Sequence, residues 1–306
     1  MSDITQLDNQ HLTTAAHHDW RERERLQTLA LAGRTPQAHG RDGVCSDPAA
    51  LVHAALFGPI ADLLARCGHR LPDCAVLNRW RTDEPSGAEC FDDRLRFVAP
   101  DRMRLGYEER VHARGEIMTR PDNWHDFFNA LVWLRFPRAK RALNDVHLRF
   151  IRPSGTRAQR GPVRDALTQF DESGIVVASA DASLLDLLAA RRWKELFWTR
   201  RADVVASMRF LVFGHGLYDA LRAPFYGICG RAAVFVVDRT VIGSDAPALC
   251  SAVDPLLAAR LAADYYPRPR ALPALPLLGI PGVTADNASP AYYDDERQFR
   301  PPPQWM

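Results

Sequence analysis

Three polar side chains interrupt an apolar stretch that reads NWHDFFNALVWLRF, and they are the first residues that could do chemistry. They are His125, Asp126 and Asn129. On a helix at about 100° per residue, His125 and Asn129 share a face, and Asp126 lies one step round, near the helix N-terminus, where a carboxylate is favoured. Because histidine titrates near neutral pH, His125 is predicted to be a catalytic acid/base that Asp126 or Asn129 orients. The alternative is a structural network that ties the helix to a neighbouring backbone.

A second polar group follows on the far side of Pro137. Lys140, Asn144 and His147 are spaced i, i+4 and i+7, so a helix places them on one face. A basic face that carries an amide suits phosphate or carboxylate groups, and these three residues are predicted to bind substrate together with Asn129. The alternative is a solvated helix face, since charged stripes usually point to water.

A third candidate lies in the motif Phe213-Gly214-His215-Gly216, where a predicted strand gives way to a predicted helix. Hydrolases place a nucleophile at such a turn, but here the residue is histidine and the G-x-S-x-G pattern is absent. His215 is therefore predicted to be a catalytic general base or a phosphate contact at a helix N-terminus, with Tyr218 beside it. The alternative is a histidine that caps the turn.

Further charged candidates follow the second polar group. Arg160, in a basic loop over residues 151–161, is predicted to hold an anion. Asp165 is predicted to line the same site, with Arg160 or Arg164 as its ion-pair partner. Asp171 and Glu172 fall at the predicted turn of a hairpin, where acidic residues are common for local reasons, so both are interpreted as structural.

No spacing in the chain specifies a metal site. An HD phosphohydrolase would need a further histidine upstream of His125-Asp126 and an aspartate downstream, all on helices, and His112 lies in a strand-like stretch. A site made from His125, His147 and a carboxylate is allowed by ligand type alone. The six cysteines include no C-x-x-C pair, and the glycine-rich phosphate-binding motifs are absent. No metal ligand or cofactor is assigned.

Charge is unevenly distributed along the chain. Residues 135–164 contain nine basic residues and one acid, a charge of +8, so the remainder carries −6 to give the net charge of +2. Such asymmetry indicates an anionic partner, a small molecule or a nucleic acid, although a composition rich in arginine accounts for part of it.

The N-terminal residues lack an apolar signal-peptide core, and no apolar run reaches the roughly 18 residues of a membrane-spanning helix. A soluble, cytoplasmic protein without a membrane partner is expected.

Helical and strand-like stretches alternate without a strict βαβ rhythm, which predicts an α+β fold with a partly antiparallel sheet in one domain. The predicted helices are 47–68 with a kink at Gly58-Pro59, 124–135, one that begins at Pro137, 183–198, 215–221 and 245–265. The predicted strands are 94–98, a pair within 105–117, a hairpin over 163–179, 208–213 and 232–237, and 70–93 is expected to be irregular.

Both ends of the chain are predicted to be arms of this domain. Residues 1–43 form a peripheral polar arm, 44–285 the single domain, and 286–306 a proline-rich tail packed on the domain. Tyr292, Tyr293 and Phe299 are expected to anchor that tail.

Several motifs resemble a known bacterial family. They read IMTRPDNWHDFFNALVWLRFPRAKRALN, RGPVRDALTQFDESG, FGHGLYDAL, LPLLGIPG and YDDERQFRP, and together they span residues 117–301. The chain is similar through them to the family catalogued as domain of unknown function 3025. The resemblance implies a bacterial origin, and it implies no reaction, cofactor or catalytic residue.

Two classes of function are consistent with these residues. The first is an enzyme, a hydrolase or transferase that uses His125 and His215 in acid/base chemistry on a phosphate-bearing or other anionic substrate. The second is a non-catalytic module that binds nucleic acid or an acidic protein through the basic segment 135–164. Convergence of both histidines with Asn129 and Lys140 within one pocket would favour the enzyme, and a flat exposed stripe of the arginines of 149–164 would favour the binding module.

Overall fold

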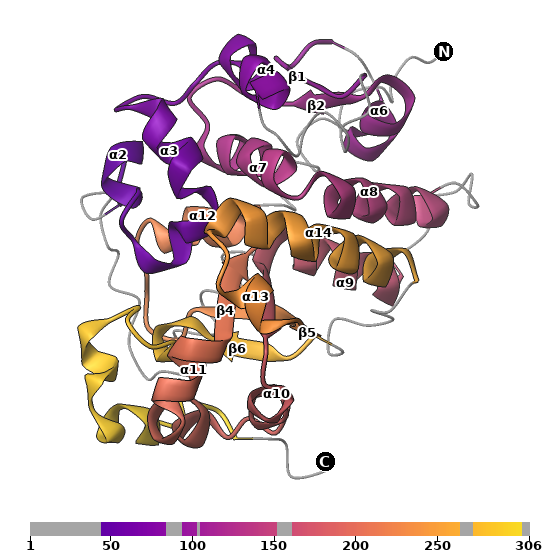
Figure 1. Ribbon diagram of the computed structural model, residues 1–306. Helices are drawn as coiled ribbons and strands as arrows, with labels where there is room; N and C mark the ends of the chain where they lie inside the picture. The colour runs from indigo at the N-terminus through magenta and orange to yellow at the C-terminus, as the bar shows by residue number, and fades with distance from the viewer. Residues whose placement is uncertain (1–43, 84–93, 103–104, 152–160, 264–271, 302–306) are drawn as a thin grey trace, which may run out of the picture. The chain divides into compact units, whose positions relative to one another are not determined.

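A sheet of four strands, in the order β4-β3-β5-β6, organises the part of the chain described here. The computed structural model describes residues 44–83, 94–102, 105–151, 161–263 and 272–301 (Figure 1). All of these residues belong to one of the chain's two units, Val44–Met306, and the predicted N-terminal arm lies outside them. Helices and two sheets make an α+β fold, which confirms the prediction.

The buried centre of the larger sheet is β3 (Gly174–Ser179). It pairs antiparallel with β4 (Met208–Val212) and parallel with β5 (Cys229–Val236), and β6 (Ala274–Pro276) pairs antiparallel with β5. Every residue of β3 is buried, as the apolar run Ile175–Ala178 indicates. Ile175 lies opposite Val212, so the start of β3 and the end of β4 meet at one end of the sheet.

The predicted helix pair about Pro137 is confirmed. Asn123 caps the first helix by accepting a 2.9 Å hydrogen bond from the Asp126 amide, and Pro137 begins the second helix, where its missing N–H costs nothing. Figure 1 shows this pair between α6 on one side and α12 and α14 on the other, and the packing contacts agree. The bounds are α7 (Trp124–Arg135), α8 (Pro137–Ile151), α12 (His215–Leu221) and α14 (Ala246–Ala262).

The predicted strand pair within residues 105–117 is wrong. The chain forms α6 (Tyr107–Arg114) and then β2 (Glu116–Met118), which pairs in parallel with β1 (Arg96–Val98). Glu109 stabilises the start of the helix, because its carboxylate accepts a hydrogen bond from the amide of Gly106. Gly115 ends it with a left-handed φ of +68°. His112 therefore lies on a helix.

The predicted hairpin over residues 163–179 is also wrong. Residues Pro162–Ser173 form α9, which runs directly into β3. Pro162 occupies the first turn, and Ala166, Leu167 and Phe170 are buried at the i, i+1, i+4 spacing of a helix face. Asp171 and Glu172 are consequently the last turn of a helix.

The N-terminal part of the domain differs from the single kinked helix that was predicted. Asp47 does cap it, accepting a 2.9 Å hydrogen bond from the Ala49 amide, and Gly68 does end it with a φ of +62°. Between them the chain breaks into α2 (Pro48–Leu51), the 3-10 helix η2 (Ala55–Ile60), which contains Pro59, and α3 (Ala61–Cys67). Of the stretch predicted to be irregular, Cys74–Asp83 form α4.

The rest of the domain follows the predicted order with shifted boundaries. Asp181, and not Ser183, caps α10 by accepting a 2.9 Å hydrogen bond from the Ser183 amide. Tyr293 and Phe299 are each 4% exposed, so both pack into the core as expected, while the predicted domain boundaries stay a prediction. No helix in the described ranges is both long and apolar enough to cross a membrane. The remaining elements are α10 (Ala182–Ala189), η3 (Glu195–Thr199), α11 (Arg201–Ser207), α13 (Arg239–Ile242), η5 (Leu277–Gly279), η6 (Ala285–Ala288) and η7 (Pro290–Asp294).

Candidate active site

Five ionisable side chains from four helices meet near the end of the sheet, and we call them the central cluster: His125, Lys140, Asp171, Glu172 and His215. The Nε2 atoms of His125 and His215 lie 3.8 and 3.6 Å from Oε1 of Glu172, and the two imidazole rings are 4.4 Å apart. Nδ1 of His215 lies 3.8 Å from Oδ1 of Asp171, to which Lys140 donates a hydrogen bond of 2.5 Å. The cluster is therefore one continuous network.

The sheet register brings the acids to His215. Glu172 lies in the last turn of α9, two residues before β3 begins, and His215 starts α12 three residues after β4 ends. Because Ile175 and Val212 are paired, both segments emerge at the same end of the sheet. The amide of Gly214 donates a 2.8 Å hydrogen bond to the carbonyl of Gly174 and fixes the approach.

The glycines that flank His215 permit this approach. A Cβ on Gly216 would lie 2.2 Å from Oε2 of Glu172, and a Cβ on Gly214 would lie 2.5 Å from the amide nitrogen of Gly174. Neither position tolerates a side chain without movement. The two glycines of the G-H-G pattern thus allow the backbone around His215 to pack closely against the end of α9.

Exposure within the central cluster is graded. The side chains of Glu172 and His215 are each 8% exposed and that of Lys140 is 2% exposed. His125 and Asp171 keep 23% and 18% of their surface accessible. A ligand would therefore meet the cluster from the side of His125 and Asp171.

Asp126 does not face the central cluster. Its carboxylate accepts hydrogen bonds from the backbone amide and the guanidinium of Arg120, at 2.8 to 2.9 Å. Burial favours the neutral acid, but these bonds hold the pKa of Asp126 below its ordinary value. Its contacts fix the start of α7, on which His125 lies.

Asn129 belongs to a neighbouring hydrogen-bonded group. Its amide nitrogen and the indole nitrogen of Trp133 each donate a 3.0 Å hydrogen bond to the hydroxyl of Tyr107. Burial raises the pKa of Tyr107 well above its ordinary value, with a further contribution from Asp171. This group lies beside Asp171, on the α6 side of the helix pair.

The face that carries Lys140, Asn144 and His147 is buried, at 2%, 4% and 4% exposure, so its interpretation as a solvated face is wrong. The amide nitrogen of Asn144 donates a 3.2 Å hydrogen bond to the Glu108 carbonyl. Burial lowers the pKa of His147, an effect that Glu108 and Asp171 only partly oppose. Among the described atoms, Oδ1 of Asn144 and Nδ1 of His147 have no hydrogen-bond partner.

Three other predicted residues lie elsewhere. Tyr218 is in the apolar core, where its hydroxyl donates a 3.0 Å hydrogen bond to the Val212 carbonyl and its ring stacks on Phe128. Asp165 is exposed in the first turn of α9. Arg160 lies outside the described residues.

Sequence reasoning missed Asp171, Glu172 and Tyr107. The first two were assigned to a hairpin turn, and the helical spacing of Ala166 and Phe170 was the signal that would have placed them at a helix end. Nothing local to Tyr107 marks it, because its hydroxyl acquires a role only when α6 packs against α7.

Donor type and spacing would allow three members of the central cluster to hold a metal ion. One ligand atom from each of His125, Glu172 and His215 lies within 4.8 Å of the others. His147, which the sequence offered as a second histidine ligand, is not part of this group.

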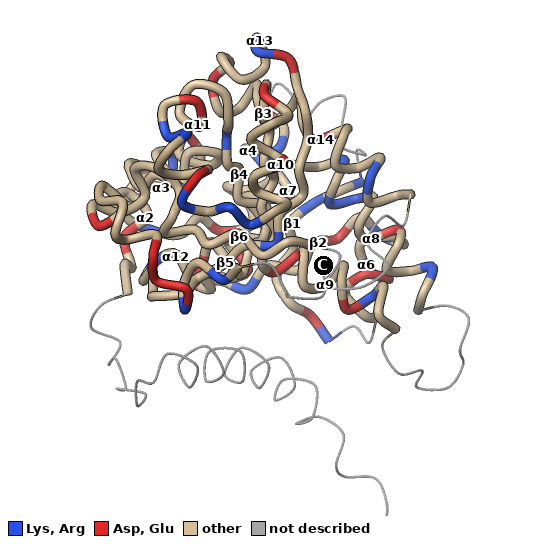
Figure 2. Tube along the Cα trace, turned by 90° about the horizontal axis from the view of Figure 1, so that it is seen from below, with Lys and Arg blue, Asp and Glu red and all other residues tan. Residues whose placement is uncertain are grey.

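The basic segment is not uniformly exposed where it is described. Arg135 is 3% exposed and donates to Asp62 at 2.7 Å, and Lys140 is bound to Asp171. Arg138 and Arg149 are exposed on α8. Figure 2 shows basic and acidic residues interspersed along the described trace, and the loop at the centre of the segment lies outside it.

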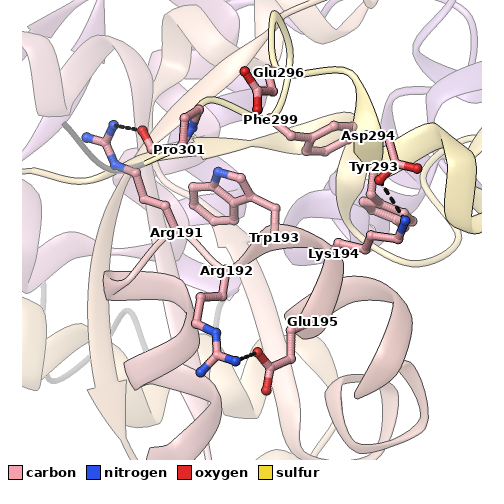
Figure 3. Close-up of a pocket in the computed structure, with 10 residues that line it drawn as sticks. All are labelled: Arg191, Arg192, Trp193, Lys194, Glu195, Tyr293, Asp294, Glu296, Phe299 and Pro301. Carbon is pink, nitrogen blue, oxygen red and sulfur yellow. Dashed lines mark hydrogen bonds and ion pairs between the residues drawn. The ribbon is translucent and has the colours of Figure 1, made fainter. Parts of the chain in front are cut away.

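A surface hollow of about 370 Å³ lies far along the chain from these residues, between residues 191–195 and the C-terminal segment (Figure 3). Its polar groups already bind one another: Lys194 pairs with Asp294 at 2.6 Å, and the Trp193 indole donates a 2.9 Å hydrogen bond to the Arg300 carbonyl. We interpret the hollow as the seam where the C-terminal segment packs.

Comparison with known proteins identifies a family and nothing closer. A family described as "Protein of unknown function (DUF3025)" matches residues 95–302. No curated protein matches the chain. No solved structure matches it.

Proposed function

The chain belongs to this family of unknown function, and we propose that it is an enzyme, a hydrolase that acts on a phosphate-bearing or other anionic substrate at the central cluster. The observation that carries the proposal is the convergence of His125, Glu172 and His215 from three separate helices, with their polar atoms within 4.8 Å of one another. Burying such groups together is costly unless they interact, and proton-transfer groups gathered in this way are typical of catalytic sites.

We assign the roles by exposure and contact. His125 is the most accessible member of the cluster, so it is the acid/base that touches substrate. Glu172 lies between the two imidazoles and accepts or supplies the proton that passes between them. Asp171, held by Lys140, is a positioning residue whose charge lies 3.8 Å from Nδ1 of His215 and acts on that ring electrostatically.

The charge of the basic segment supports an anionic substrate. The sequence predicted that Lys140 binds the substrate, but its ammonium group is bound to Asp171. Another cation must therefore hold the substrate. Arg138 and Arg149 remain exposed on α8 and are suited to carboxylate or phosphate contacts.

The test is hydrolysis of a chromogenic panel of phosphomonoesters, phosphodiesters and carboxylate-bearing esters. We expect the wild-type protein to turn over at least one class, and the His215→Ala and Glu172→Gln variants to lose about 100-fold or more, as losses of acid–base groups do. His112→Ala is the control, because His112 is a surface histidine that pairs with Asp145 at 3.5 Å. Equal rates for the wild type and the His215→Ala variant, including none for either, would overturn the assignment.

A further inference from the structure

We propose that His125, Glu172 and His215 bind a divalent transition-metal ion of the zinc class. The inference rests on the proposed function in that it concerns the same site, and it changes the roles there: with an ion bound, the three side chains are its ligands and not proton-transfer groups, and the activation of water would come from the ion. It is argued below from spacing, donor type and the surrounding contacts.

The distances between the three ligand atoms are slightly longer than those in a metal-bound site. Ligand atoms about 2.1 Å from a tetrahedral ion lie roughly 3.4 Å from one another. Here the two Nε2 atoms lie 3.8 and 3.6 Å from Oε1 of Glu172, and all three ligand atoms fall within 4.8 Å. Binding an ion would shorten the two carboxylate contacts by a few tenths of an ångström, and it would also draw together the two imidazole nitrogens, which lie within 4.8 Å of each other.

The donor set selects the class of ion. Calcium and magnesium prefer all-oxygen surroundings, whereas two imidazoles with one carboxylate suit zinc and its first-row neighbours. Three protein ligands leave a further position for water or substrate, which is the arrangement of catalytic rather than structural zinc. The 23% exposure of the His125 side chain gives that position a route to solvent.

The contacts behind His215 have the form of a second coordination shell. Metal-binding histidines commonly direct their other ring nitrogen at a carboxylate, which fixes the ring and raises its basicity. Nδ1 of His215 lies 3.8 Å from Oδ1 of Asp171, a charge contact longer than a hydrogen bond, and Asp171 is held in turn by Lys140. Lys140 is 2% exposed, so the support is built into the core.

Room for the ligating carboxylate is also built in. Gly216 lies where any Cβ would meet Oε2 of Glu172, so the backbone of α12 leaves space for that side chain against the imidazoles. A bound cation would neutralise Glu172 between two uncharged rings, as Lys140 neutralises Asp171.

The experiment measures metal content and affinity on the full chain with any affinity tag removed. The protein is stripped with chelator, titrated with Zn²⁺ and Co²⁺ by calorimetry, and its Co²⁺ form is examined by visible absorption. We expect one equivalent per chain and the absorption of a four- or five-coordinate site. Zinc should also raise the unfolding midpoint, since an ion that binds only the folded state stabilises it.

Variants separate this site from adventitious binding. His215→Ala and Glu172→Gln should weaken zinc binding more than about 100-fold, and Asp171→Asn about 10- to 100-fold while the stoichiometry is kept. His112→Ala and a His17→Ala, His18→Ala double variant are the controls, the latter because adjacent histidines near the N-terminus can bind metal by themselves. Far-UV circular dichroism shows whether each variant is folded.

The outcomes distinguish the two proposals. Zinc binding that is absent from the wild type, or unchanged in folded Glu172→Gln and His215→Ala variants, would overturn the metal site. If turnover still depends on His215 when no metal binds, the hydrolase proposal stands without the ion. If metal binds as expected and no turnover is found, the hydrolase proposal fails and the metal site stands.

Discussion

Replacing Lys140 with methionine tests the buried ion pair that supports the central cluster. The side chains of Lys140 and Asp171 are 2% and 18% exposed, and their charged atoms lie 2.5 Å apart. Methionine keeps the apolar stem between Trp133 and Phe213, whose ring centroids are 5.6 and 6.0 Å from Nζ. The substitution therefore removes the charge and little of the packing.

The expected loss in the free energy of unfolding follows from the Asp171 charge that remains without a partner. Removing one partner of a buried pair destabilises a protein by about 3–5 kcal/mol, because the other charge stays uncompensated. Asp171 retains some contact with water, so the loss should be near the lower limit, about 3 kcal/mol. At about 2–4 °C per kcal/mol for a domain of this size, the unfolding midpoint should fall by roughly 6–12 °C.

The assays are thermal unfolding for the midpoint and urea unfolding for the free energy, both followed by far-UV circular dichroism at pH 7, with Lys194→Met as the matched control. Lys194 is the other lysine in the chain, and its pair with Asp294 has side chains 46% and 59% exposed, so its loss should cost no more than about 1 kcal/mol. Asp171→Leu completes a double-mutant cycle. A loss below about 1 kcal/mol for Lys140→Met, or additivity of Lys140→Met and Asp171→Leu within about 0.5 kcal/mol, would refute the reasoning.

Three further predictions concern neighbouring groups. Burial raises the pKa of Asp254 to about 6, so the folded state holds this proton more tightly than the unfolded chain does. The free energy of unfolding of the wild type should therefore fall by up to about 3 kcal/mol between pH 4 and 7, relative to that of the Asp254→Asn variant. Urea unfolding across that pH range measures the difference. Gly216→Ala should displace the Glu172 carboxylate and cost about 1–3 kcal/mol, whereas Gly58→Ala, which meets nothing within 4 Å, should be close to neutral; equal midpoints for the two variants would contradict this. Tyr107→Phe leaves two buried donors without their acceptor and should cost about 2 kcal/mol or more, and a thermal midpoint within 1 °C of the wild type would exclude that role.

Local signals were sufficient for α7, α8 and α12, but not for α9, which also begins with a proline. The predicted bounds of α7 and α12 agree with the structure because Asn123 caps the first and Gly214 precedes the second. Elements without such signals failed: α6 was taken for strands, since its residues are polar and its start depends on the contact between Glu109 and Gly106.

The members of the central cluster were only partly predictable from the sequence, for a related reason. His125, Lys140 and His215 were recognised because a polar residue in an apolar run is conspicuous in the sequence itself. Glu172 acquires its place only through the pairing of Ile175 with Val212, and Lys140 is buried only because Asp171 is there to receive it. Those are long-range contacts, and a single sequence carries no direct sign of them.

Because α9 passes directly into β3, the register of the sheet sets the distance between Glu172 and His215. No loop separates Glu172 from the strand that begins at Gly174, so one step of strand register, about 3.3 Å, would carry the carboxylate away from His215 by nearly the distance that now separates them. The site therefore has little tolerance for insertions at this junction. The spacing of Glu172 and His215 is thus set by the backbone, whereas His125, with 23% of its side chain exposed, lies on the more accessible side of the cluster.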